Sequence, residues 1–286
     1  MVCAEDLIVK SIGLGEKMNR IFFFMKFQIN QAGFKISFAV LALLNIIGMV
    51  MGYIQNYQND FVFIRSAADN FLLTSTDSRT IRMAFALCFP LLASSLCNGS
   101  KAGSGLFSML RMDKKQYIYE NAVVAVIVTV ISFMAALGLN QLLCFAAFPL
   151  SGSDNRWGMR EYGLLDSFQA DLLFDIWSIQ NPYLYNFLYI VIISVLAGGI
   201  AFLTYGLGYI KSLGRLKPVQ LSALVFIAFI ALFVISGLLD VPAINFMSYV
   251  EPGRAVSVLQ YVFFTGCIYI AGLVLTIRGK KIYEYL

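Results

Sequence analysis

The chain has 286 residues, of which 59% are hydrophobic and only 13% are charged, and its formal net charge is +5. A soluble domain carries about a quarter charged residues because its surface faces water, so this composition indicates a protein surrounded largely by lipid. The absence of histidine removes the usual general base and the commonest zinc ligand, which disfavours metalloproteases and most nucleophilic catalysts.

Six stretches are long and apolar enough to cross a bilayer as helices, which takes about 20 residues each. The third contains the β-branched run 123–130, but a lone strand in lipid leaves its backbone unpaired, so a helix is expected there too. The third stretch is also long and has to tilt or extend beyond the lipid. The expected spans are residues 36–54, 81–98, 121–149, 185–210, 219–239 and 256–277.

Lysine and arginine set the expected orientation. With the N-terminus in the cytoplasm, 15 of the 21 basic residues fall on the cytoplasmic side of these spans and six on the other side. Cytoplasmic loops of membrane proteins carry such an excess. We therefore expect a single all-α integral membrane domain over residues 1–286 with both termini in the cytoplasm. Its expected parts are a cytoplasmic or interfacial segment 1–35, a six-helix bundle 36–277 and a cytoplasmic tail 278–286. The expected location of this multi-pass chain is a bacterial plasma membrane.

Two segments outside the spans are expected to form amphipathic helices. Residues 17–35 mix phenylalanines with lysine and arginine, a pattern typical of a helix in the headgroup layer; alternatively, the segment only extends the first span. Residues 161–180 repeat apolar side chains at helical spacing with aspartates between them, which predicts a helix on the extracellular face. The glycines of the fourth span serve either close helix packing or a hinge.

Ionisable side chains are nearly absent from the interiors of the spans. Glu120 and Asp240 are expected at span ends, beside water. A proton- or sodium-coupled carrier normally needs a carboxylate within the membrane. The sequence therefore disfavours a secondary transporter.

The connection between the second and third spans, residues 99–120, is the most informative segment. Its sequence GSKAGSGLFSMLRMDKKQYIYE passes from glycines to apolar residues and then to a basic cluster. It is either a docking helix for a cytosolic partner or a loop that follows the rule of positive cytoplasmic charge. The residues expected to dock are Leu106, Phe107, Met109, Leu110, Arg111, Lys114 and Lys115.

The order of these elements resembles the ABC-2 type permease family of export-type ABC transporters. The resemblance places Lys101, Gly103 and Gly105 at a turn, residues 106–111 at the ATPase-coupling helix, and Lys114 and Lys115 at a basic pair. Residues 240–256 are similar to the family's short outer segment between the fifth and sixth spans, and the tail RGKKIYEYL also fits. Glu120 departs from the pattern, since a lysine often opens the third span.

The resemblance implies a permease subunit without a catalytic site or cofactor of its own. Two such subunits, the same or homologous, would form the pathway in the lipid bilayer, and cytosolic ABC ATPases would bind the ATP. The substrate would be amphipathic: a peptide antibiotic, a lipid-like molecule or a drug; no nucleic acid is implied. The alternative is a non-transporting membrane scaffold or immunity protein that binds a partner or peptide through residues 161–180.

The orientation can be tested by labelling single cysteines. In a cysteine-free background, cysteines at Asp154 or Ser66 are expected to react with an impermeant maleimide on intact cells, whereas cysteines at Ser104 or Lys280 are not, because the basic residues lie mostly on the other side. Reaction at Ser104 without permeabilisation would reverse the orientation.

Overall fold

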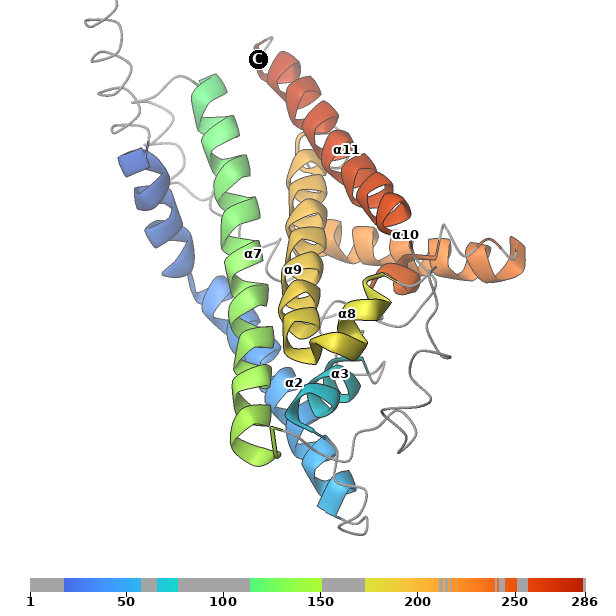
Figure 1. The fold of residues 1–286 in the computed structure, drawn as a ribbon. Helices are drawn as coiled ribbons and strands as arrows, with labels where there is room; N and C mark the ends of the chain where they lie inside the picture. Colours follow the sequence, from blue (N-terminus) through green and yellow to red (C-terminus); the bar gives the residue numbers. More distant parts are fainter. Residues whose placement is uncertain are drawn as a thin grey trace, which may run out of the picture.

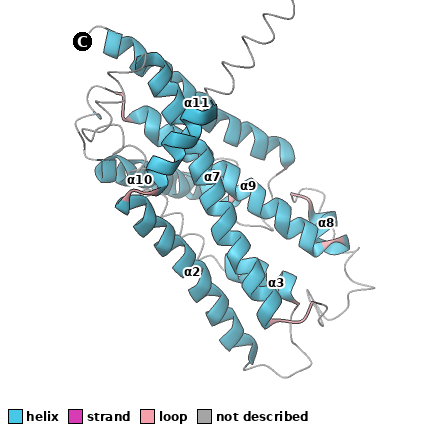
Figure 2. Cartoon of the chain, turned by 90° about the vertical axis from the view of Figure 1, so that its left-hand side faces the viewer, coloured by secondary structure: helices cyan, strands magenta, loops and turns pink. Residues whose placement is uncertain are grey.

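The computed structural model describes part of the chain in detail. The described residues are 18–57, 66–76, 114–150, 173–210, 213, 216, 218–239, 241, 245–250 and 257–284. They form helices joined by turns and loops, and no strand occurs among them (Figure 2). The expected second span 81–98 and the docking segment 106–111 lie outside these ranges, as does most of the expected amphipathic segment 161–180.

Five described helices are long and apolar enough to cross a membrane, which indicates a multi-pass membrane protein. They are α2 (Ala32–Tyr57), α7 (Lys114–Ala147), α9 (Pro182–Leu207), α10 (Pro218–Leu239) and α11 (Val258–Glu284). Each corresponds to one of the expected spans. At 1.5 Å per residue, the 34 residues of α7 reach about 51 Å, well beyond a hydrocarbon core of about 30 Å.

Contacts along α2 and α7 show that these two helices run in the same direction. Near the start of α7, the ring of Tyr117 packs edge-on against Phe24, which precedes α2. Near its end, the ring of Phe148 lies 5.8 Å from that of Tyr53 at the end of α2. The two helices therefore begin at one end of the bundle, which we call the Lys114 end, and finish at the other, the Pro149 end.

The helix α9 runs antiparallel to α7 and parallel to α11. The Tyr205 hydroxyl donates to the carbonyl of Ile118 near the Lys114 end. Near the start of α11, the Tyr261 hydroxyl donates to the carbonyl of Ile192 on α9. Further along both helices, the Gly272 backbone of α11 lies close to Gly206 of α9. The starts of α2 and α7 and the ends of α9 and α11 therefore gather at the Lys114 end (Figure 1). Which side of the membrane this end faces stays a prediction.

Glycines allow α9 to approach both of its neighbours closely. A Cβ added at Gly198 would lie 2.7 Å from Val130 on α7, and one added at Gly206 would lie 2.9 Å from the carbonyl oxygen of Gly272 on α11. Small residues permit such approach between helices in lipid. The described geometry therefore favours close packing over a hinge as the role of these glycines.

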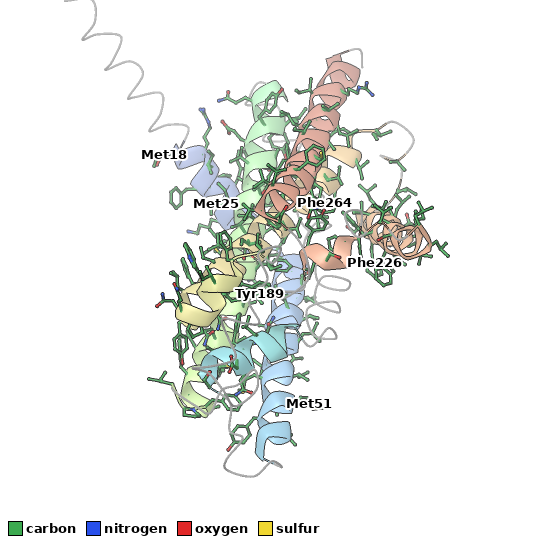
Figure 3. The ribbon with its side chains drawn as sticks, turned by 45° about the vertical axis from the view of Figure 1, so that its right-hand side comes forward. Met18, Met25, Met51, Tyr189, Phe226 and Phe264 are labelled. Carbon is green, nitrogen blue, oxygen red and sulfur yellow. The ribbon has the colours of Figure 1, made fainter. Side chains whose placement is uncertain are left out.

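The helix α10 has few neighbours and runs across the direction of α7, α9 and α11 (Figures 1 and 3). Its first half packs through the buried side chains of Leu221 and Val225. The ring of Phe229 lies 4.6 Å from that of Phe246 in η5 (Phe246–Tyr249). Its last residues, Leu238 and Leu239, are exposed. Near that end, Ser236 is buried and its hydroxyl donates to the Val241 carbonyl at 2.8 Å. The expected fifth span is therefore a helix whose contacts in the described ranges lie mainly in its first half and around Phe229.

A helix over residues 18–29 follows the course of α2 along the first turns of α7 (Figure 1). It stops before Asn30 and Gln31, and α2 begins at Ala32. Phe24 is buried, whereas Phe22 and Phe23 are exposed. This arrangement favours an extension of the first span with a break, and immersion of the two exposed rings in the headgroup layer stays a prediction.

A short helix, α3 (Ala67–Thr76), lies between the expected first and second spans, outside both of them. Its first turn is packed among α2, α7 and α9, and the preceding Ser66 is 3% exposed. A cysteine at Ser66 is therefore a poor reporter of topology, because an impermeant reagent does not reach a buried side chain. Of the two outer positions, Asp154 is the one to use, and it lies outside the described residues.

The close approach of α9 to α11 predicts opposite effects for two glycine substitutions. Gly206→Ala places a methyl group against the Gly272 backbone, and such overpacking typically costs about 1–3 kcal/mol. Gly266→Ala, on α11, meets nothing within 4 Å and is expected to be neutral or to stabilise the helix by up to about 1 kcal/mol. Thermal unfolding in detergent measures both. Equal midpoints for the two variants would contradict the packing role of Gly206.

Candidate functional site

The described residues offer no metal centre. They contain no group of three or more histidine, cysteine or acidic side chains that could hold a metal ion. Cys144 is buried and Cys267 exposed, and neither forms a disulfide within the described part of the chain; the Cys144 Sγ donates to Asn140 Oδ1 at 3.4 Å. The polar groups best placed for a function are instead side chains buried between the helices.

Four side-chain amides meet inside the bundle near the Pro149 end, and we call them the amide cluster. Each is almost fully buried although it lies on an apolar helix: Asn45 on α2, Asn140 and Gln141 on α7, and Asn186 on α9. A buried amide without a hydrogen-bond partner costs about 1–3 kcal/mol. The amides therefore have to bond to one another and to nearby backbone.

The bonds within the amide cluster join three spans. The Asn186 Nδ2 donates to Gln141 Oε1 at 2.8 Å, which links α9 to α7. The Asn140 Nδ2 donates to Asn45 Oδ1 at 3.4 Å, which links α7 to α2. The Asn45 Nδ2 in turn donates to the Leu41 carbonyl of its own helix at 2.9 Å. The cluster thus cross-links α2, α7 and α9 in an apolar setting.

The same amides bind the first turn of α3. The Asn186 Nδ2 also donates to the Ala68 carbonyl at 3.1 Å, and the Gln141 Nε2 donates to the Ala67 carbonyl at 3.5 Å. Two buried oxygens beside these bonds, Asn186 Oδ1 and Asp69 Oδ2, have no hydrogen-bond partner among the described residues. The cluster is therefore a polar contact between a short helix and two spans, and its acceptors are only partly satisfied.

Tyr189 connects this region to η5. Its ring packs edge-on against Phe71 of α3 at 6.4 Å between centroids, and its hydroxyl donates to the Val250 carbonyl at 2.6 Å. Figure 3 shows Tyr189 inside the bundle and Met51 at its outer edge. The Tyr249 ring stacks on Phe264 of α11 at 4.0 Å, and burial raises the pKa of Tyr249 above its ordinary value. The segment around η5, which belongs to the expected short outer segment 240–256, is therefore anchored between α9 and α11.

A second polar site lies at the Lys114 end, and we call it the Arg20–Glu120 clasp. The Arg20 Nε donates to Glu120 Oε1 at 3.3 Å, and the Gln116 Nε2 donates to the same oxygen at 3.0 Å. The Glu120 side chain is only 3% exposed, while that of Arg20 is 29% exposed. The other carboxylate oxygen, Oε2, is buried and has no hydrogen-bond partner in the described ranges. The clasp ties the helix over residues 18–29 to the beginning of α7.

The burial of Glu120 corrects the expectation that it lies beside water at a span end. The helix over residues 18–29 continues along α7 and covers this carboxylate, and Phe24 covers the neighbouring Tyr117. Position along the chain locates a residue relative to a span end, but it does not reveal a neighbour from a distant segment. Glu120 therefore faces a protein partner of opposite charge.

The structure leaves the predicted docking site largely undescribed. Leu106, Phe107, Met109, Leu110 and Arg111 lie outside the described residues, and Lys114 and Lys115 are the first two residues of α7. The amide cluster was missed by the sequence analysis. The available signal was the presence of asparagine and glutamine within apolar spans, where polar side chains usually face other helices.

Comparisons with known proteins add no assignment. The chain matches no protein-family model, no curated protein and no solved structure. The interpretation of its function therefore rests on the arrangement of its helices and on the two polar sites.

The clasp predicts non-additive effects of removing its charges. Arg20→Gln and Glu120→Gln each weaken the pair, and the double variant is expected to be more stable than the sum of the single losses predicts, by about 0.5–3 kcal/mol. A thermodynamic cycle of detergent unfolding measures this coupling. Lys26→Gln, at an exposed site on the same helix, is the control and is expected to change stability little. Strict additivity would mean that the two charges do not stabilise each other.

Proposed function

We propose that this chain is the membrane-spanning permease subunit of an ABC exporter, which couples ATP hydrolysis by a separate cytosolic ATPase to the efflux of an amphipathic substrate. The observation that carries the proposal is α7. This continuous helix of 34 residues begins three residues after the docking segment 106–111 and contacts α2, α3, α9 and α11. A displacement of the docking segment would therefore reach four other helices through one rigid element.

The two polar sites support a role of α7 in transmitting motion. At the Lys114 end, the clasp joins α7 to the helix over residues 18–29 through Glu120. At the Pro149 end, Gln141 bonds to α9 and α3. Because a helix is stiff along its axis, movement at one end is delivered to the other over about 51 Å. This is the arrangement that an ATP-driven permease requires.

The directions of the helices support six spans. Because α2 and α7 run parallel, the chain between them has to return from the Pro149 end to the Lys114 end. Residues 81–98, the expected second span, form the apolar stretch that the sequence offers for this return, and we take them as the span that completes the six. The starts of α2 and α7 and the ends of α9 and α11 lie at the Lys114 end (Figure 1). The excess of basic residues in the connections expected there supports a cytoplasmic position for this end.

The remaining parts of the proposal follow from the composition of the chain. Two copies, or this chain and a homologue, would form the pathway in a bacterial plasma membrane. The ATPase partner would bind ATP, so this subunit needs neither a catalytic residue nor a cofactor. Apolar and aromatic side chains dominate the surfaces of the spans, which suits an amphipathic peptide, lipid-like molecule or drug better than a strongly charged substrate.

The docking segment provides the test of this function. Leu106→Ala, Phe107→Ala and Leu110→Ala are each expected to cost about 1–3 kcal/mol of binding to the ATPase, because each removes apolar burial. Phe107→Asp is expected to cost more, since it buries an unpaired charge. Pull-down of the ATPase and ATP hydrolysis in nanodiscs are the measurements.

The matched control is Ser153→Ala, which lies on the opposite side of the expected membrane. It should leave binding and hydrolysis unchanged. Full retention of the ATPase and full activity in Phe107→Asp would show that residues 106–111 do not dock, and the proposed function would lose its main support from the sequence.

A further inference from the structure

The helix α3 is too short to cross a membrane, yet its first turn is buried. Its ten residues reach about 15 Å, half of the hydrocarbon thickness. Ala67, Ala68 and Phe71 are 0% exposed, and α3 contacts α2, α7 and α9. Figure 1 shows it beside the lower ends of these three helices. It therefore occupies the space between three spans at the Pro149 end.

Besides the apolar burial of Ala67, Ala68 and Phe71, a few hydrogen bonds at its first turn attach α3 to the spans. Besides the amide bonds to the Ala67 and Ala68 carbonyls, the backbone N–H of Ala67 donates to the Pro149 carbonyl at 2.8 Å. In a helix, a first-turn carbonyl also accepts the N–H four residues later. The amide bonds are therefore additional to the bonds that hold α3 together, and α3 can separate from the spans without unwinding.

When α3 is packed against the spans, as in this structure, two buried oxygens of the described residues lack hydrogen bonds. Within the described part of the chain, Asn186 Oδ1 and Asp69 Oδ2 are buried without a hydrogen-bond partner, and such groups raise the free energy of the state that buries them. If α3 moves outward, water reaches both oxygens and offsets part of the cost of breaking the amide bonds. The closed and open positions of α3 are thus closer in free energy than the number of contacts suggests.

We propose that α3 is a gate at the Pro149 end of the bundle, and that the side chains of Gln141 and Asn186 are the latch that holds it shut. Gln141 belongs to α7 and Asn186 to α9, so a relative shift of these two helices breaks the latch bonds directly. The identity of the molecule that passes the gate depends on the proposed function. The latch itself is a property of this bundle and can be tested without an ATPase.

Cys144 is a natural reporter of gate opening. It is fully buried and packs in the same core as Ala67 and Phe71, one turn from the latch residue Gln141. Replacing Cys3, Cys88, Cys97 and Cys267 by alanine leaves it as the single thiol. Its rate of reaction with a membrane-impermeant methanethiosulfonate is then measured in intact cells and in inverted vesicles, so that the result does not depend on the orientation.

The test variant replaces both latch amides by leucine, Gln141→Leu with Asn186→Leu. The bond between the two amides loses both partners at once, and the Ala67 and Ala68 carbonyls keep their bonds within α3. The fold is therefore expected to survive, and insertion and thermal stability verify this. From the Pro149 side, Cys144 is expected to react at least about tenfold faster than in the parent, as expected for an increased population of a locally open state. Should the double variant fail to insert, Gln141→Leu alone carries the test with a smaller increase.

The control is Asn121→Leu, a buried amide near the other end of α7 that donates to the Tyr117 carbonyl of its own helix. It should react at the parent rate. An unchanged rate in the latch variants, or an equal increase in Asn121→Leu, would overturn the gate. If the latch variants label faster but no ATPase partner is found, the gate proposal stands and the permease assignment fails.

Discussion

One amide group, Asn186 Nδ2, joins three helices of the described structure through its hydrogen bonds. This nitrogen donates to Gln141 Oε1 and to the Ala68 carbonyl, so it joins α9, α7 and α3 at one point. Within a bilayer, no water is available to satisfy a polar group that faces lipid. The amide therefore has to face protein, and this requirement fixes the rotation of α9 relative to α7.

The rotation of α9 also determines which side chains meet the rest of this helix. With Asn186 turned towards α7 and α3, the small residues along α9 meet Val130 of α7 and the Gly272 backbone of α11. Tyr189, one turn beyond Asn186, then reaches the Val250 carbonyl after η5. Polar contacts set the orientation of the helices, and small residues set their distance. Neither would suffice alone, because apolar side chains have no preference for protein over lipid tails.

The sequence predicted the elements whose signal is local and missed those that depend on distant contacts. Length and hydropathy indicated α2, α7, α9, α10 and α11, including the helix through the β-branched run 123–130, because lipid forbids an unpaired strand. The helix α3, by contrast, is too short for a span signal, and its stability comes from burial among three distant helices. The burial of Glu120 depends in the same way on Arg20, 100 residues earlier. The docking residues 106–111 lie outside the described part, so their role rests on the resemblance and on the position of α7.

The most direct test of the permease assignment is to purify the tagged chain from its native membranes in a mild detergent, together with its untagged neighbours. The eluate is analysed by mass spectrometry and assayed for ATP hydrolysis. We expect a stoichiometric partner with a phosphate-binding P-loop, and ATP hydrolysis that co-elutes with the complex. Elution of the chain alone, or with a stoichiometric partner that lacks a nucleotide site, would contradict the permease assignment and favour a membrane scaffold or immunity protein.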